Sequence, residues 1–407
     1  MTVSHWRRST NPGATIGCDV CVVGAGIAGV SAALHLERLG ISVIVLERDR
    51  PASGASGKNA GFLMRGAADN YAVACRDWGR DTARLVWHWT EENLAALRAL
   101  GIDSIPTVQR IPSCLLGLEA EEAAELADAA RLLAEDGFAV GLIDRGDDLA
   151  WRPRSPRACG PLIGLVNPDD AACNPVHLLE FLSLQLARPI LERQEVVDIS
   201  VGPGERVAVR TAEHTVECRR ALVCTNAYAP LLMPELALFV RPTRGQMLAL
   251  RLPGHPRLDM SYYANRGYEY FRQTTEGTIV LGGCRRRHAH AEVGFEDRTT
   301  PEVQRDLEAF ARDHLGDDFT ITARWAGIMG FSGDALPLIG PVPAPWNASA
   351  LVWFAGGCTG HGMSLFHRVA QAAVDAMIRG VPNPFPLERA LRSAREAAAG
   401  PTPPLHA

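Results

Sequence analysis

The sequence predicts an α/β fold that carries a second domain of the α+β type. An apolar run at residues 20–23 passes directly into a glycine-rich turn, and a similar run at 351–355 precedes another such turn. Runs of this kind are typical of parallel strands that are buried on both faces and followed by a helix. Between 195 and 282, by contrast, the strand-like segments are short and separated by turn residues, which is typical of antiparallel sheets.

The turn after the first apolar run contains Gly24, Gly26 and Gly29 in the spacing G-x-G-x-x-G. In this pattern the first glycine permits a tight turn, the second lets the backbone approach a pyrophosphate, and the third lets the helix pack closely on the sheet. The phosphate then lies at a helix N-terminus, where free N–H groups and the positive end of the helix dipole stabilise its charge. The segment therefore predicts a Rossmann-like nucleotide-binding unit.

The elements that follow agree with this prediction. An amphipathic helix extends to about residue 39, and Gly40 is suited to the position just after its end. A second apolar strand, 41–46, ends at Glu47, about twenty residues after the glycines, which is the spacing at which a carboxylate binds ribose hydroxyls. Because that carboxylate would repel a ribose 2′-phosphate, NADP is disfavoured, whereas FAD and NAD both fit the pattern.

A segment of small residues, 52–61, comes next and is too rich in glycine and serine for a strand core. It is either a flexible surface loop or a place where the backbone approaches a ligand closely, which larger side chains would block. Further along, amphipathic periodicity predicts helices over 81–100, 119–135, 176–186, 301–315 and from about 363 to 380. Asn174 and Pro175 supply an N-cap and a first-turn proline to the third of these helices.

The middle of the chain predicts strands. Short β-rich segments occur at 195–201, 207–211, 215–218, 221–224, 246–252, 268–273 and 278–282. We interpret the first four as an antiparallel piece that interrupts the parallel pattern. Aromatic residues concentrate nearby at Tyr262, Tyr263, Tyr268, Tyr270 and Phe271. They form one aromatic face of a sheet or the wall of a substrate pocket, and both interpretations can hold together.

Composition limits the classes of partner. With 407 residues, 47% of them apolar, the chain can bury a large core, and its formal net charge of −5 gives no sequence-wide attraction to nucleic acid or anionic membrane. No apolar run reaches the roughly twenty residues of a membrane span, and no metal site is predicted. Ten scattered cysteines and the lack of a signal peptide predict free thiols in a reducing cytoplasm. Small molecules are therefore the expected partners.

Several motifs occur in the same order as in a known family. They are the glycine triplet, Glu47, the loop 54–61, and residues 221–227, 244–246, 337–340 and 360–362. Together they resemble the FAD-dependent glycine oxidase, sarcosine oxidase and D-amino-acid oxidase family over nearly the whole chain. The resemblance implies a two-domain flavoprotein of the glutathione-reductase type, with a Rossmann-like FAD-binding domain and an antiparallel-sheet substrate domain.

The resemblance also divides the chain. The FAD-binding domain is expected to be discontinuous and to comprise 17–90, 155–235 and 325–385. The substrate domain is expected to comprise 91–154 and 236–324. Residues 1–16 are expected to form a flexible N-terminal tail and 386–407 a C-terminal tail.

By the same resemblance, three groups of residues hold FAD. The phosphates and adenosine are assigned to Gly24, Ala25, Gly26, Gly29, Glu47 and Arg48, with adenine contacted through the backbone of Val197. The isoalloxazine ring is assigned to Ser56, Ala60 and Gly61, and the flavin pyrimidine to the last glycine-rich turn with Gly357, Gly360, Gly362 and Met363. That turn begins a helix, so its N-terminus would stabilise the negative charge that develops on the reduced flavin.

The family oxidises a C–N bond of an amine or amino acid, such as a D-amino acid, an N-methyl amino acid or a polyamine derivative. Hydride passes from carbon to flavin and leaves an imine that water hydrolyses, so no indispensable acid–base side chain is expected. The alternatives are a dehydrogenase that passes electrons to an acceptor other than O2, and a flavin hydroxylase. Gly333-Asp334-Ala335 superficially matches the hydroxylase pattern, but its position before Pro337 fits the amine-oxidase pattern better.

The chain departs from the family where the substrate binds. The basic residue that clamps a substrate carboxylate corresponds to Gly360 or Ser364 here, so another arginine would have to replace it. Candidates are Arg65, Arg244 and above all Arg272, which follows Tyr270 on a strand expected to face the flavin. The expected substrate residues are Arg272, Tyr270, Tyr263 and His361.

Three further residue patterns bear on the cofactor and the acceptor. The stretch 326–334, where sarcosine oxidases carry the cysteine that attaches flavin, has no cysteine, so FAD is expected to be noncovalent. The oxygen-activating lysine of those enzymes corresponds to the apolar Val280, which puts oxidase activity in question. The cluster 285–287 of three arginines is either an anion site or, as we prefer, a solvated strand end.

Overall fold

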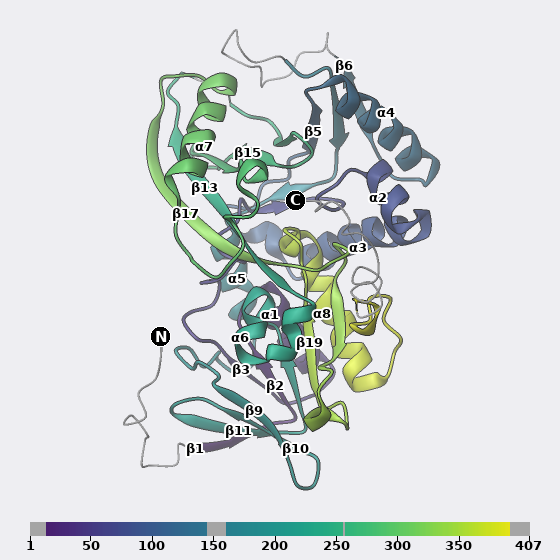
Figure 1. Cartoon of the computed structure of the whole chain (residues 1–407), viewed down its shortest axis with the longest axis vertical. Coiled ribbons are helices and arrows are strands. Elements are labelled where there is room, and N and C mark those ends of the chain that lie inside the picture. The colour runs from purple at the N-terminus through teal and green to yellow at the C-terminus, as the bar shows by residue number, and fades with distance from the viewer. Residues whose placement is uncertain (1–13, 145–159, 255–256, 391–407) are drawn as a thin grey trace.

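The computed structural model describes residues 14–144, 160–254 and 257–390. Within them the strands form four sheets, of which a five-stranded and an eight-stranded sheet carry most of the molecule (Figure 1). The predicted mixed α/β fold is confirmed. The predicted tails at 1–13 and 391–407, and residues 145–159 of the predicted domains, lie outside the described residues.

The five-stranded sheet contains the first predicted strand. Its order is β18 (Leu338–Pro341), β19 (Val352–Gly356), β12 (Arg220–Val223), β2 (Val20–Val23) and β3 (Val43–Leu46). All neighbours are parallel except the edge strand β18. Side chains of β2 alternate between two core clusters, Val20 and Val22 in one and Cys21 and Val23 in the other, so the strand is buried on both faces as predicted.

Helices cover one face of this sheet and a second sheet covers the other. The helical layer comprises α1 (Ile27–Arg38), α3 (Arg80–Ala99), α5 (Pro175–Ser183) and α8 (Gly362–Arg379). The opposite layer is a four-stranded sheet with the order β1 (Ala14–Gly17), β11 (His214–Cys218), β10 (Arg206–Arg210) and β9 (Asp198–Gly202). The three layers occupy the lower part of Figure 1.

The eight-stranded sheet lies above them in Figure 1 and is antiparallel except between β14 and β5. Its order is β17 (Thr320–Phe331), β13 (Arg241–Arg251), β16 (Ile279–Gly283), β15 (Glu269–Gln273), β14 (Ser261–Ala264), β5 (Ser113–Gly117), β7 (Ile163–Asn167) and β6 (Gly141–Asp144). The remaining α-helices and strands are α2 (Tyr71–Trp78), α4 (Ala120–Glu135), α6 (Ala229–Leu232), α7 (Pro301–His314), and the paired strands β4 (Phe62–Leu63) and β8 (Ala171–Ala172).

The two faces of the large sheet have different neighbours. One face packs on α7 and buries Tyr262 and Phe271, whose rings stack at 5.1 Å. The other face carries Tyr263 and Tyr270 and packs against Phe62 of β4. Because side chains alternate along a strand, the aromatic cluster is divided between a core and a second surface.

Two predictions about strands were wrong. Segment 221–224 was assigned to an antiparallel piece, but β12 is a central strand of the parallel sheet, paired with β2 and β19. Residues 14–16 were assigned to a flexible tail, but they belong to β1, which pairs in parallel with β11. Both pairings join segments far apart in the chain, so no local pattern reports them.

The boundaries of the predicted domains also move. Residues 163–167 and 325–331 were assigned to the FAD-binding domain, but as β7 and the end of β17 they belong to the eight-stranded sheet. At the other end, Leu387 is buried, and its backbone N–H donates to the Ile339 carbonyl, so the C-terminal tail starts later than residue 386. In the described part of the chain, no helix combines the length and apolar character needed to cross a membrane.

Candidate functional site

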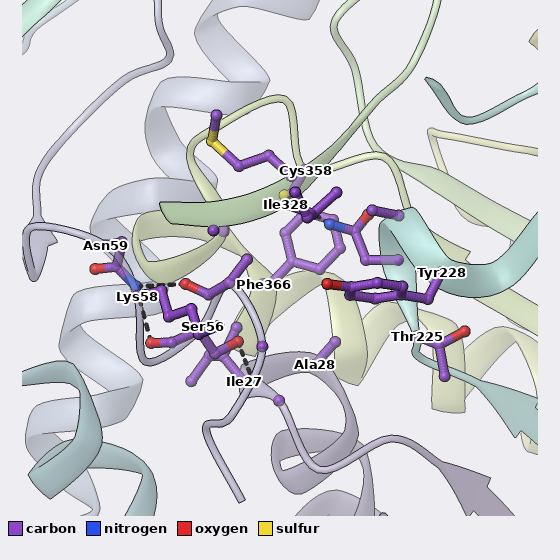
Figure 2. Close-up of a pocket in the computed structure, with 18 of the residues that line it drawn as sticks. Ile27, Ala28, Ser56, Lys58, Asn59, Thr225, Tyr228, Ile328, Cys358 and Phe366 are labelled. Carbon is purple, nitrogen blue, oxygen red and sulfur yellow. Dashed lines mark hydrogen bonds between the residues drawn. The ribbon is translucent and has the colours of Figure 1, made fainter. Parts of the chain in front are cut away.

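One cavity of ≈ 470 Å³ extends along the carboxyl ends of β2, β3 and β12 to the second aromatic face of the large sheet. Its lining contains Gly24, Gly26, Glu47, Arg48, Ser56, Ala60, Val197, Gly360, Gly362 and Met363 of the predicted FAD residues, and Tyr263, Tyr270 and His361 of the predicted substrate residues. Ala25, Gly29, Gly61, Gly357 and Arg272 do not line it. Figure 2 shows the Tyr228 ring entering the cavity opposite the loop that carries Ser56 and Lys58.

The three predicted glycines occupy the turn between β2 and α1. Gly24 has a φ of +100°, a conformation that favours glycine, and a Cβ on Gly29 would stand 1.8 Å from the Gly24 carbonyl oxygen. The third glycine is therefore required for close packing of helix and strand, as expected. A Cβ on Gly26 would lie 2.9 Å from the Ser56 hydroxyl, which itself accepts the Ile27 N–H at 3.0 Å (Figure 2). Both residues thus hold the turn against the loop after β3.

Glu47 stands at the end of β3, where its carboxylate accepts two backbone N–H groups. The donors are Ala25 at 2.7 Å and Asp49 at 2.9 Å. Each carboxylate oxygen accepts one of these bonds and keeps a lone pair free, so Glu47 can still accept hydroxyl donors from a ligand in the cavity. Ala25 contributes through its N–H rather than by lining the cavity.

The neighbouring residues form the same end of the cavity. The guanidinium of Arg48 lies over the Tyr228 ring, 4.9 Å from its centroid. The N–H of Val197 donates to the Arg210 carbonyl at 2.8 Å. A backbone contact from Val197 to adenine must therefore use its carbonyl group.

The small-residue loop after β3 contributes directly to the cavity wall. Asn59 fixes its shape: the side-chain amide donates to the Ala55 and Ser56 carbonyls at 3.0 and 2.8 Å and accepts the Gly61 N–H at 2.7 Å (Figure 2). The loop therefore lines the cavity and is not a free surface loop, while its close approach to a ligand stays a prediction. Gly61 has a different role from the one expected, since a Cβ there would stand 1.9 Å from the Cys173 carbonyl oxygen and it does not line the cavity.

The second glycine-rich turn leads into α8 and closes the cavity. Gly357 has a φ of +71° and donates its N–H to the Asn226 side chain at 2.9 Å, so it positions the turn without lining the cavity. His361 precedes α8, and burial lowers its pKa to about 4, so the imidazole is neutral near pH 7. Both of its ring nitrogens, and the hydroxyl of Thr225 in the same lining, are buried without a hydrogen-bond partner. Buried polar atoms of this kind usually have a hydrogen-bond partner, and a polar ligand or water in the cavity would supply it.

An aromatic wall faces that turn. Tyr263 makes edge-to-face contacts with Tyr270 at 5.8 Å and with Phe62 at 5.2 Å, and its ring lies 6.0 Å from His361. Burial raises the pKa of Tyr270 to about 12 and raises that of Tyr263 further, so both phenols are neutral at any working pH. Tyr263 and Tyr270 line the cavity, whereas Tyr262 and Phe271 belong to the core on the other face of the sheet.

Arg272, the leading candidate for a carboxylate clamp, does not face the cavity. Its guanidinium donates to the Ala60 and Cys173 carbonyls, both at 2.5 Å, and to the Gln109 side chain at 3.3 Å. Arg272 was expected on a strand that faces the flavin, and it lies on the same face of β15 as Tyr270, but at Arg272 the loop after β3 covers that face. We therefore correct its role to that of a support beneath Ala60.

The other two candidates are also occupied. Arg65 is ion-paired with Glu91 at 3.0 Å and donates to Asn167 at 2.7 Å. Arg244 is ion-paired with the buried Glu292 at 2.7 Å. Neither arginine lines the cavity.

Several lining residues were not assigned to the site from sequence. They are Lys58, Thr225, Asn226, Tyr228, Cys358 and Arg285. Lys58 forms an ion pair with Asp297. Arg285 belongs to the cluster of three arginines interpreted as a solvated strand end; that interpretation holds for the exposed Arg286 and Arg287 but not for Arg285.

The turn that superficially matched a hydroxylase lies elsewhere. Asp334 is ion-paired with Arg389 at 2.6 Å and accepts the Leu336 N–H at 3.2 Å, and it does not line the cavity. Among the described residues, no group of three or more histidine, cysteine or acidic side chains is placed to hold a metal ion.

Comparisons with known proteins agree with this geometry. Residues 19–376 match the family model DAO, described as FAD dependent oxidoreductase. The chain is 25% identical to gamma-glutamylputrescine oxidoreductase of Escherichia coli K12 over 423 residues, covering 96% of this chain and 95% of that protein. It is 27% identical to glycine oxidase of Pseudomonas aeruginosa over 345 residues, covering 80% and 86%.

Solved structures share the fold. L-proline dehydrogenase from P. horikoshii superposes with a TM-score of 0.75 at 16% identity, covering 94% of this chain and 99% of that one. Glycine oxidase from Geobacillus kaustophilus superposes with a TM-score of 0.74 at 20% identity, covering 91% and 96%.

Proposed function

The chain belongs to the DAO family of FAD-dependent oxidoreductases, and on that premise we propose that it oxidises a C–N bond of a small amine or amino acid. The observation that carries this proposal is the continuity of one cavity from the glycine turn and Glu47 to the aromatic wall. A cofactor bound along this cavity would have Tyr263 and Tyr270 near its reactive end. Two relatives are named gamma-glutamylputrescine oxidoreductase and glycine oxidase, after an amine and an amino acid, which supports the same substrate class here.

The residues of the cavity fit FAD along its length. Glu47 would bind the ribose hydroxyls, the turn at Gly24 and Gly26 would pass the pyrophosphate, and the loop with Ser56 and Ala60 would lie beside the ring system. The N-terminus of α8 would point its partial positive charge at the flavin pyrimidine. The buried polar atoms of Thr225 and His361 that lack protein partners would find them on such a ligand.

FAD supplies the hydride-accepting chemistry, and the chain's own residues bind, orient and shield the substrate. Tyr263, Tyr270 and Phe62 form an apolar wall that limits the access of water to the reacting carbon. The two phenols and His361 are neutral near pH 7 because burial shifts their pKa values. None of them is a strong base, so the substrate amine has to bind in its neutral form or lose its proton to solvent.

We propose that FAD binds noncovalently. Two kinds of electron acceptor, O2 and another molecule, each have one observation in their favour. A dehydrogenase is the second candidate because Val280, which takes the place of the oxygen-activating lysine, packs with the apolar cluster at the cavity. Lys58, on the loop after β3, is a cation in the cavity lining. A cation there favours O2 as the electron acceptor. Reoxidation of the reduced protein by dissolved O2 within seconds supports an oxidase, and reoxidation only by an added dye supports a dehydrogenase.

We also propose a cytoplasmic location. All nine cysteines in the described part of the chain are free thiols, which is typical of a reducing compartment.

A panel experiment tests the function. The purified yellow protein is mixed anaerobically with D-amino acids, N-methyl amino acids and polyamine derivatives while flavin absorbance is followed. Bleaching by at least one amine supports the proposal. Bleaching only by NADPH would support the hydroxylase instead, and bleaching only by hydroxy acids would mean that a C–O bond is oxidised.

A further inference from the structure

Arg285 is a cation in the cavity lining that the fold supports by ring contacts. It follows β16, and its guanidinium carbon lies 4.9 Å from the centroid of Phe331 and 5.5 Å from that of Tyr268. Ring contacts of this kind use the faces of the planar guanidinium. The N–H donors at its edge are left for another partner.

No carboxylate in the described part of the chain takes that place. The other arginines near the cavity have partners: Arg244 binds Glu292, Arg65 binds Glu91, and Arg272 binds backbone carbonyls. Among the residues that the structure describes, the side chain of Arg285 forms neither an ion pair nor a hydrogen bond, whereas its backbone carbonyl accepts the His288 N–H at 2.9 Å. A largely buried guanidinium without an anion is costly, and burial accordingly lowers the pKa of Arg285.

The surroundings of Arg285 place it at the substrate end of the cavity. Tyr268 lies on the loop into β15, two residues before Tyr270, and Phe331 ends β17, two residues after Met329. The Met329 sulfur would be 3.9 Å from a Cβ on Gly360, at the turn before α8. Arg285 is thus held by rings that neighbour the aromatic wall and the glycine-rich turn.

We propose that Arg285 binds a carboxylate of the substrate and thereby makes the enzyme selective for acidic amines and amino acids. This inference rests on the proposed function, because it names the substrate class of that same cavity. A guanidinium edge and a carboxylate form two parallel hydrogen bonds, and Tyr268 and Phe331 hold the edge in a fixed plane. The positive charge of Arg285 also offsets the free-energy cost of desolvating the carboxylate when it enters the cavity.

Two variants and one control test the proposal in the FAD-loaded protein. Arg285→Gln removes the charge, Arg285→Lys keeps the charge but loses the paired geometry, and Arg287→Gln changes an exposed arginine of the same turn. FAD content and the flavin spectrum are measured first for each protein. Substrate kinetics are then compared on an amino acid and its matched amide.

The expected result is selective for the charge of the ligand. Arg285→Gln should raise the KM of the acid by at least about thirty-fold while changing that of the amide by less than about three-fold, since a buried charge-assisted pair is lost only with the acid. Arg285→Lys should retain part of the preference, and Arg287→Gln should behave as the unmodified protein. An equal change on acid and amide, or none with Arg285→Gln, would overturn the proposal.

A binding measurement separates this proposal from the proposed function. Acetate and propionate, with acetamide and propionamide as neutral partners, are titrated into the oxidised protein while flavin absorbance is followed. The acids should perturb the spectrum and the amides should not, and Arg285→Gln should abolish the difference. If no amine bleaches the flavin but this acid selectivity is present, the proposed function fails and Arg285 still binds carboxylates. If amines bleach the flavin without any acid selectivity, only the role of Arg285 fails.

Discussion

Replacing Arg272 with methionine should destabilise the protein rather than change its substrate preference. The side chain is 3% exposed and is the hydrogen-bond donor to the Ala60 and Cys173 carbonyls. Methionine has a side chain of similar reach but no hydrogen-bond donor, so the buried Ala60 and Cys173 carbonyls both lose their partner. A hydrogen bond to a charged group contributes about 1.5–3 kcal/mol, so the combined loss is roughly 3–6 kcal/mol.

This loss can be measured as a shift in Tm. With an unfolding entropy of about 2.1 cal/mol/K per residue, the Tm of this chain of 407 residues should fall by about 4–7 °C. Because Ala60 lines the cavity, FAD should dissociate more easily as well. Thermal release of flavin fluorescence reports both effects, and Arg251→Met, at an exposed strand end, is the matched control. A normal Tm and FAD content together with a selective loss of affinity for acidic substrates would refute the reasoning and return Arg272 to the role of clamp.

Three further predictions concern the cofactor and pH. Gly26→Val should abolish FAD binding in a protein that is still folded, because even a Cβ would stand 2.9 Å from the Ser56 hydroxyl; Gly17→Val, where a Cβ meets nothing within 4 Å, is the control, and normal flavin content in Gly26→Val would contradict the assignment of the turn. Acid precipitation should release intact FAD into the supernatant, and flavin in the pellet would instead indicate attachment to a residue such as Cys358 or His361 at the cavity. Burial lowers the pKa of His367 from 6.5 to about 4, so the unfolded chain binds more protons between these values and the free energy of unfolding should rise with pH across that window, by at most about 3 kcal/mol from this residue. In His367→Gln that slope should be smaller in urea titrations at pH 4.5 and 6.5, and an unchanged slope would show that His367 does not contribute.

The nucleotide-binding half of the site could be predicted because its signals are local. The strand, the three glycines and Glu47 lie within thirty residues of one another. Each glycine was predicted for a separate steric reason, and the structure shows that a side chain would be strained at Gly24 and would clash at Gly29. The parallel pairing of β12 could not be predicted in the same way. Four apolar residues form a similar pattern in either type of sheet, and only partners more than a hundred residues away decide between them.

The substrate half of the site shows a different limit. The sequence placed Tyr270 and Phe271 in one aromatic cluster, whereas β15 turns them to opposite faces of the sheet. No local pattern showed that the loop after β3 covers Arg272. For Arg285 the misleading signal was its neighbours, since three consecutive arginines are typical of a solvated strand end. Only tertiary structure shows that the first of them lies on the rings of Tyr268 and Phe331.

Product analysis of a single anaerobic turnover tests the central claim most directly. The FAD-loaded protein is mixed with an amine substrate in slight deficit, and reduced flavin, carbonyl product and released amine or ammonia are each quantified. Oxidation of a C–N bond in this cavity predicts equal amounts of all three. Flavin reduction without release of an amine, or with recovery of an intact C–N bond, would contradict it.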